Sequence, residues 1–206
     1  MSQFFRIHPD NPQGRLLDGA ARIVRSGGLM VYPTDSCYAL GAGLGDRRAA
    51  DRIRRLRGAG RGRYFTLVCR DLSEISTYAR LENWAYRLLR SLTPGPYTFV
   101  LRATREVPRR LQDPKRRSIG IRVPDHPIAR GLLVALGEPI MSSTLMLPGD
   151  EIPMTDAEEI RARLENQLDL IVDGGPCGIE PTTILDLSKD DVRVLRQGKG
   201  PVAGLV

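Results

Sequence analysis

The stretch VYPTDSCYALGAG, residues 31–43, decides the fold. Its first apolar run ends at Pro33, which cannot donate to a sheet ladder. Four small polar or thiol side chains follow, and a second apolar run then reaches Gly41. The pattern predicts two short strands joined by a polar turn. Hydroxyls and backbone N–H groups in such a turn suit a carboxylate or phosphate ligand, although an ordinary strand connection uses the same residue types.

Composition narrows the class of protein. A chain of 206 residues fits one domain and can bury a core without disulfides or a structural metal. Its three cysteines are far apart, which argues against a disulfide framework and a zinc site. Its two histidines give little support to a histidine metal centre or a Ser-His-Asp triad. With no signal-like or membrane-length apolar run, we expect a cytoplasmic protein that does not enter a membrane.

Charge is unevenly distributed along the chain. The net charge is +7, with arginine concentrated in residues 47–63 and in residues 102–122. Acidic residues dominate from 150 to 191. This segregation predicts a positive surface for polyphosphate or nucleic acid.

Strand-like and helix-like segments alternate along the chain, which indicates an α/β fold with a twisted sheet of mixed direction, flanked by helices. We expect one helix to begin with Pro12 after an Asn11 cap. A second is expected to begin at Asp46, and another after a capping box formed by Thr155 and Glu158. No linker divides the chain, so residues 1–206 are predicted to form a single domain.

The segment SIGIRVP, residues 118–124, predicts a strand with an unusual face. Ile119, Ile121 and Val123 share one side of it, while Gly120 and Arg122 share the other. An arginine in mid-strand, beside a residue without a side chain, indicates a charge that points into a cavity. A structural salt bridge is an equally good explanation.

The segment RGAGRGR, residues 57–63, predicts a basic glycine-rich loop. It lacks the GxxxxGK[ST] pattern of a P-loop. The composition of this segment fits a loop that folds over phosphates, and it fits a solvated linker equally well.

Several of these motifs together resemble the threonylcarbamoyl-adenylate synthase family, whose fold is the YrdC-like domain. The resemblance rests on YPTDSCYALG (32–41), TPGPYTFVL (93–101), IGIRVPDHP (119–127), VDGGPCGIEPTTILDL (172–187) and RQG (196–198). The chain is most similar to the YciO subgroup, because of its opening MSQFF and IHPDNPQ, its FTLVCRDLSE run and its SSTLMLPGD segment.

This resemblance implies a nucleotidyltransferase of weak or divergent activity. The family converts L-threonine, bicarbonate and ATP, the last with Mg²⁺, into threonylcarbamoyl-adenylate and pyrophosphate for tRNA modification. No tightly bound cofactor and no protein metal ligand are expected. The alternative is a protein without catalysis that binds double-stranded RNA or tRNA on a basic concave face, through the backbone and shape of the RNA.

The resemblance also assigns binding residues, though no acid–base catalyst. On the threonine side it implies Thr34, Ser36, Arg122, Ser142 and Thr182. On the nucleotide side it implies Arg57, Arg61, Arg63, Ser118, Thr144 and Arg196.

Two family motifs are altered, and both lie on the ATP side. Lys-x-Arg reads here as residues 57–59, RGA, and Ser-Ala-Asn reads as Thr144-Leu145-Met146. We expect Met146→Asn combined with Leu145→Ala to restore a family-like loop that binds ATP more tightly, by about 1 kcal/mol.

Overall fold

One mixed sheet runs through the described part of the chain, which comprises residues 1–58 and 65–205 of the computed structural model. Its strand order is β1-β8-β2-β3-β7-β4-β6-β5-β9-β10. The strands are β1 (Gln3–Arg6), β2 (Met30–Tyr32), β3 (Ala39–Gly43), β4 (Thr66–Val68), β5 (Tyr97–Arg102), β6 (Ser118–Arg122), β7 (Ile140–Thr144), β8 (Leu170–Asp173), β9 (Thr183–Asp186) and β10 (Arg193–Arg196). The predicted α/β fold with a twisted, mixed sheet is confirmed.

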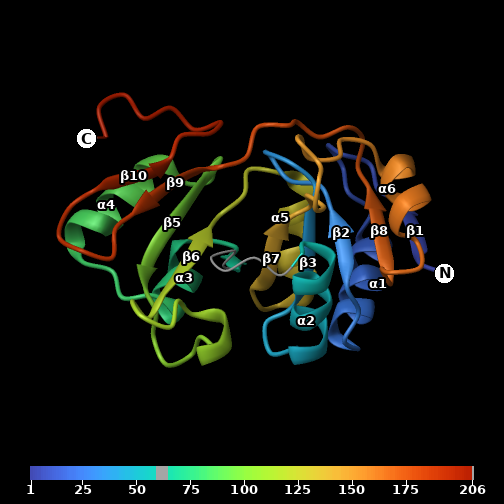
Figure 1. Cartoon of the computed structure of the whole chain (residues 1–206), viewed down its shortest axis with the longest axis horizontal. Helices are drawn as coiled ribbons and strands as arrows, with labels where there is room; N and C mark the ends of the chain where they lie inside the picture. The colour runs from blue at the N-terminus through green and yellow to red at the C-terminus, as the bar shows by residue number, and fades with distance from the viewer. Residues whose placement is uncertain (59–64, 206) are drawn as a thin grey trace.

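Helices cover the sheet and link its strands. They are α1 (Gly14–Arg25), α2 (Arg47–Leu56), α3 (Leu72–Tyr78), α4 (Asn83–Leu92), α5 (Pro127–Leu136) and α6 (Ala157–Leu164), with a short 3₁₀ turn η1 (Arg109–Leu111). Figure 1 shows β1, β2 and β8 at the end of the sheet nearest the N-terminus, and β9 and β10 at the other end with α4. No helix in residues 1–58 and 65–205 is long and apolar enough to cross a membrane.

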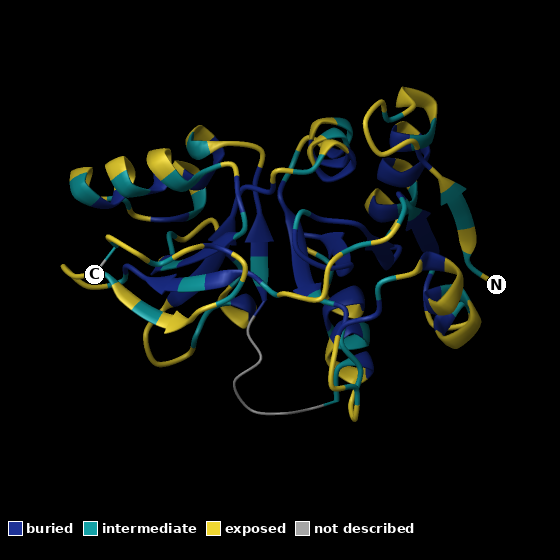
Figure 2. Ribbon diagram, turned by 90° about the horizontal axis from the view of Figure 1, so that it is seen from above, coloured by how far each residue is buried: buried dark blue, intermediate teal, exposed yellow. Residues whose placement is uncertain are grey.

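Strand β2 shows how the two faces of the sheet are filled. Val31 belongs to one apolar cluster, together with side chains of α2, α4 and α6. Its neighbours Met30 and Tyr32 belong to a second cluster, together with side chains of α1 and α5. Because side chains alternate along a strand, a continuous apolar run is what a strand buried on both faces requires. Figure 2 accordingly shows the central strands buried and the outer helix surfaces exposed.

The predicted polar turn connects β2 and β3, which form an antiparallel pair with Val31 opposite Leu40. Strand β3 also pairs with β7, and Gly41 lies opposite Ser142. Beyond β7 the order continues through β4 to β6, the strand that ends at Arg122. This order brings the turn, the hydroxyls of β7 and the strand arginine to one region of the sheet.

The start of α1 differs from the sequence prediction. The helix begins at Gly14 after Gln13, whose carbonyl accepts from the N–H groups of Leu16 and Leu17 at 3.0 and 3.1 Å. The prediction of Pro12 after an Asn11 cap was wrong. The N–H of Asn11 donates instead to Nδ1 of His8 at 3.2 Å, so this residue belongs to a turn that precedes the helix.

Of the two other predicted helix starts, that of α2 is confirmed and that of α6 is wrong. Asp46 caps α2 as predicted, because its Oδ1 accepts from the N–H of Ala49 at 2.8 Å. The predicted capping box of Thr155 and Glu158 was wrong by one residue. Asp156 caps α6, accepting from the N–H of Glu159 at 2.9 Å. Both acceptors are aspartates, which rank above threonine as N-caps.

Candidate functional site

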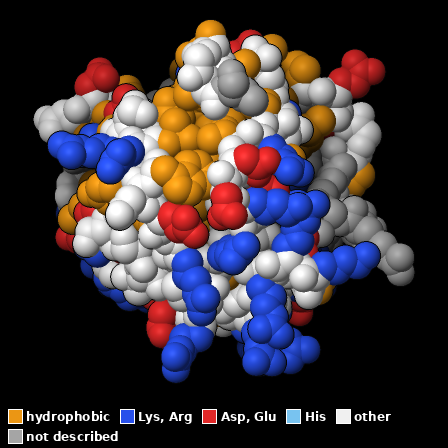
Figure 3. All heavy atoms as spheres, turned by 90° about the vertical axis from the view of Figure 1, so that its left-hand side faces the viewer, with side chains coloured by type: hydrophobic (Ala, Val, Ile, Leu, Met, Phe, Trp, Pro, Cys, Tyr) orange, Lys and Arg blue, Asp and Glu red, His pale blue; other side chains and the backbone are white. Residues whose placement is uncertain are grey.

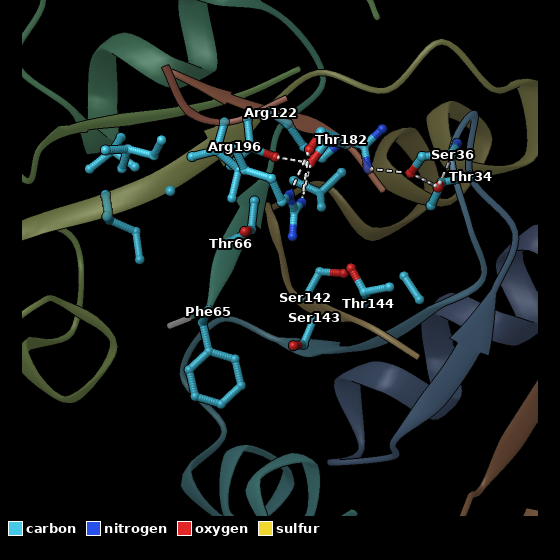
Figure 4. Close-up of a pocket in the computed structure, with 18 of the residues that line it drawn as sticks. Thr34, Ser36, Phe65, Thr66, Arg122, Ser142, Ser143, Thr144, Thr182 and Arg196 are labelled. Atoms are coloured by element: carbon cyan, nitrogen blue, oxygen red, sulfur yellow. Dashed lines mark hydrogen bonds between the residues drawn. The ribbon is translucent and has the colours of Figure 1, made fainter. Parts of the chain in front are cut away.

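A cavity of about 410 Å³ lies where the polar turn, β7 and β6 meet (Figure 4). Nine of the residues assigned from the sequence line it: Thr34, Ser36, Arg57, Ser118, Arg122, Ser142, Thr144, Thr182 and Arg196. The predictions at Arg61 and Arg63 lie outside the described residues. The structure therefore brings both predicted halves of the site into one cavity, while the ligand roles of these residues stay predictions.

Thr34 holds the shape of the polar turn. Its hydroxyl donates to the carbonyl of Cys37 at 2.7 Å and accepts from the N–H groups of Ser36 and Cys37 at 3.2 and 3.3 Å. The side chain is buried and fully engaged in these contacts. Thr34 thus fixes the position of Ser36, whose own hydroxyl lies at the cavity surface.

Arg122 reaches this turn from the end of β6, as Figure 4 shows. One of its terminal nitrogens, Nη1, donates to the hydroxyl of Ser36 at 3.2 Å, and the other, Nη2, donates to the carboxylate of Asp35. Both partners of this ion pair are buried, with side-chain exposures of 8% and 9%. The two explanations of the mid-strand arginine therefore hold together, because Arg122 lines a cavity and forms a salt bridge.

The Asp35–Arg122 pair is incompletely satisfied. Nε of Arg122 and Oδ2 of Asp35 are buried and have no hydrogen-bond partner among residues 1–58 and 65–205. A guanidinium has five N–H donors, and two of them are used by the described residues. Arg122 therefore retains donors for a carboxylate in the cavity.

The hydroxyls of β7 form a second wall. Ser142 donates to the carbonyl of Leu40 at 2.9 Å, so it accepts from the hydroxyl of Tyr32, also at 2.9 Å. Burial raises the pKa of Tyr32 to about 12, which keeps that donor protonated. The next residue, Ser143, accepts from Arg57, which follows the last residue of α2. This contact brings a cation from α2 to the cavity edge.

The opposite wall comes from β5, β9 and β10. The hydroxyls of Thr98 and Thr182 lie 2.8 Å apart, and Arg196 donates to the carbonyl of Thr182 at 2.8 Å. Partial burial lowers the pKa of Arg196 below its usual value, yet the group stays a cation at neutral pH. Arginine thus reaches the cavity from several separate elements.

Sequence reasoning missed Arg116, which also lines the cavity. The turn before β6 places it, because Oδ1 of Asp113 accepts from the N–H groups of Lys115 and Arg116, each at 2.8 Å. Arg116 then donates to Asp186 at 3.1 Å. The Asp-Pro pair at 113–114 is typical of a turn, but only the fold shows that this turn faces the cavity.

Nucleophilic and metal chemistry find little support in the described residues. Cys37 lines the cavity, but burial raises the pKa of its thiol to about 11. Its thiolate fraction at pH 7 is therefore about one in ten thousand. No group of three or more metal-ligating side chains occurs within residues 1–58 and 65–205. The cavity combines hydroxyls with guanidinium groups, a set suited to holding acidic ligands in a fixed alignment.

Comparisons with known proteins identify relatives of this chain. A family model named for Sua5, YciO and YrdC and described as telomere recombination matches residues 22–198. The uncharacterized protein YciO of Escherichia coli K12 is 57% identical over 202 residues, 98% of each chain. The crystal structure of E. coli YciO matches with a TM-score of 0.97, at 56% identity and full coverage of both chains.

More distant relatives carry functional names. A threonylcarbamoyl-AMP synthase of Nitrosococcus oceani is 31% identical over 156 residues, which cover 75% of this chain and 83% of the relative. The crystal structure of P. abyssi Sua5 complexed with L-threonine matches with a TM-score of 0.90 at 25% identity. The match covers all of this chain and 62% of the P. abyssi chain.

Proposed function

The chain belongs to the Sua5/YciO/YrdC family, and we propose that it joins L-threonine, bicarbonate and ATP to give threonylcarbamoyl-AMP, pyrophosphate and water. The observation that carries this proposal is the buried guanidinium of Arg122, which lines the cavity and uses one donor each of Nη1 and Nη2 on Ser36 and Asp35. A synthase relative and a threonine-bound relative support the choice of substrate.

The threonine end of the proposed site is the corner between the turn and β6. The amino-acid carboxylate would accept from Arg122 and from the hydroxyl of Ser36. Thr182 and Ser142, on the two other walls, offer hydroxyls to the rest of the ligand. The donors are held by the fold before the ligand arrives, which lowers the entropy lost on binding.

The nucleotide end would be formed by Arg57, Arg196, Ser118 and Thr144, with Arg116 as a further cation. Mg²⁺ would enter as part of the MgATP substrate. In the proposed step a carbamate oxygen attacks the α-phosphorus and the bond to pyrophosphate breaks. That displacement needs in-line alignment and charge neutralisation, and arginines supply both. A site with little histidine is therefore chemically adequate for it.

The altered Ser-Ala-Asn motif is expected to reduce activity. The side chain of Leu145 is fully buried in the core, whereas Met146 is partly exposed. Of these two residues and Thr144, only Thr144 lines the cavity. The family's asparagine amide thus has no counterpart in the described part of the cavity wall, and we expect weaker ATP binding than in a synthase that carries it.

The test is release of pyrophosphate by the purified protein with MgATP. We expect release that requires both L-threonine and bicarbonate, and a large rise in KM for threonine in Arg122→Lys, because a lysine cannot reproduce a bidentate contact. The matched control is Arg52→Lys, whose ion pair with Asp169 lies away from the cavity. Release that is independent of threonine, or none above background, would contradict the proposal.

A second candidate function is binding of double-stranded RNA or tRNA. Cations around η1 form an exposed group: Arg105, Arg109, Arg110, Lys115 and Arg117. Figure 3 shows Lys and Arg side chains gathered over the lower part of one face of the molecule. Such a surface fits phosphate backbones.

The salt dependence of RNA affinity tests this candidate. Each lost phosphate contact should reduce the slope of log affinity against log salt by about 0.7–0.9. We expect the double variant Arg105→Ala and Arg109→Ala to bind duplex RNA more weakly and to keep its affinity for L-threonine. An affinity that does not respond to salt would exclude this mode of binding.

A further inference from the structure

We propose that Asp35 is a specificity-determining residue of the cavity. Its carboxylate gives the corner of the cavity between the polar turn and β6, where Arg122 lies, a preference for an α-amino acid. The molecule that is disfavoured is the same acid without its amino group. This inference rests on the proposed function and deepens it, because it names the feature of the substrate that the corner recognises.

Asp35 lies in the polar turn, beside the cavity. It lies between Thr34 and Ser36, whose side chains line the cavity, and its own carboxylate pairs with Nη2 of Arg122. Asp35 itself is not among the described residues that line the cavity. Its charge therefore lies beside Arg122 and outside the described cavity lining.

The burial of the pair makes that charge effective. With side-chain exposures of 8% and 9%, water screens Arg122 and Asp35 little. A simple carboxylic acid would bring one negative charge to a corner that already holds Asp35. An α-amino acid brings its ammonium group to the same corner, where it is attracted to Asp35 while its carboxylate binds Arg122.

Other charges near the corner do not replace this effect. Lys199 is exposed and donates to the backbone carbonyl of Asp35, so solvent weakens its field. Arg196 is engaged by Thr182 on the opposite wall. Near a protein surface, charges about 5 Å apart change an affinity by on the order of a hundredfold before desolvation is subtracted. We therefore expect a net selectivity from Asp35 of about tenfold or more.

The experiment compares two ligands that differ only in the amino group. L-threonine is zwitterionic, and (R)-3-hydroxybutyrate keeps its carboxylate, hydroxyl and methyl groups. Their dissociation constants are measured by calorimetry for the wild type, Asp35→Asn and Asp35→Glu. The matched control is Asp169→Asn, which breaks an ion pair with Arg52 away from the cavity. Thermal unfolding of each variant without ligand reports whether it folds.

The ratio of the two constants decides the question. We expect the wild type to prefer L-threonine, and Asp35→Asn to reduce that preference about tenfold or more. Asp35→Glu and the control should keep it. If Asp35 only supports the fold, Asp35→Asn lowers the affinity for both ligands by the same factor. If Asp35 merely occupies the ligand's place on Arg122, the change raises both affinities by the same factor. Either of these results, with its unchanged ratio, overturns the inference.

Two further outcomes separate this inference from the proposed function. A wild type that binds threonine and (R)-3-hydroxybutyrate equally overturns the inference alone, whereas a wild type that binds neither overturns both. If Asp35→Asn does not fold, the calorimetric comparison is replaced by a crystal structure of the wild type with L-threonine. The threonine nitrogen should then lie within about 6 Å of the Asp35 carboxylate. A nitrogen directed away from Asp35 contradicts the inference.

Discussion

Replacing Arg122 with glutamine tests whether the buried ion pair supports the fold as well as the site. The change removes the donors to Ser36 and Asp35 and leaves a carboxylate that is 9% exposed without its cation. Loss of one partner of a buried pair costs about 3–5 kcal/mol, mainly because the remaining charge stays desolvated. We expect Arg122→Gln to lower the free energy of unfolding by this amount.

The assay is urea unfolding of Arg122→Gln, of Asp35→Asn and of the double variant. Removing both charges avoids the uncompensated carboxylate, so the double variant should be more stable than the sum of the single losses predicts. We expect a coupling free energy of about 2 kcal/mol between the two sites. If the single losses add to within about 0.5 kcal/mol, the two side chains do not interact as described, and the reasoning is refuted.

Three further predictions concern other parts of the molecule. Asp46→Ala should cost about 1 kcal/mol of stability, measured by urea unfolding, because α2 loses its N-cap. Leu145→Ala should cost about 2–5 kcal/mol in the same assay by opening a cavity in the core, while Met146→Asn should cost less than about 1 kcal/mol. Burial lowers the pKa of His126 below its usual 6.5, so the unfolded chain binds more protons, and this part of the stability is lost as pH falls below 6.5. His126→Gln should flatten the fall in stability between about pH 7 and pH 5, and an unchanged pH profile would contradict the assignment.

Local signals in the sequence predicted the fold, the polar turn and the strand arginine, whereas the other cavity residues were assigned through the resemblance. An apolar run broken at Pro33 and a polar turn are read within a dozen residues, and the alternation in residues 118–124 places Arg122 opposite an apolar face. The β3–β7 register then places Ser142 opposite Gly41, on the strand that follows the turn, and Ser142 lines the same cavity. Asp46, with its short side chain directly before a helix, was likewise a local signal.

What the sequence could not predict depends on contacts between distant segments. The partner of Arg122 lies 87 residues away at Asp35, and no local pattern distinguishes that pair from an open cavity. Arg116 lies on a turn whose direction is fixed by its contact with Asp186, 70 residues further on. The start of α1 was misplaced because His8 draws Asn11 into a preceding turn.

The leucine of the altered motif also changes the expected effect of restoring it. Leu145 is completely buried, so Leu145→Ala combined with Met146→Asn removes core packing at the same time as it adds an amide. The gain of about 1 kcal/mol in ATP binding stays a prediction, to be measured by titration on the folded fraction of the double variant. Met146→Asn alone, which leaves the core intact, is the cleaner comparison.

A crystal structure of the protein with L-threonine and a non-hydrolysable ATP analogue tests the central claim most directly. We expect the threonine carboxylate on Arg122 and Ser36, and the triphosphate between Arg57 and Arg196, with both ligands in the one cavity. The α-phosphorus should lie about 3–3.5 Å from the position that a carbamate oxygen on the threonine nitrogen would take. Ligands bound elsewhere on the molecule, or a threonine that leaves Arg122 paired with Asp35 alone, would contradict the account.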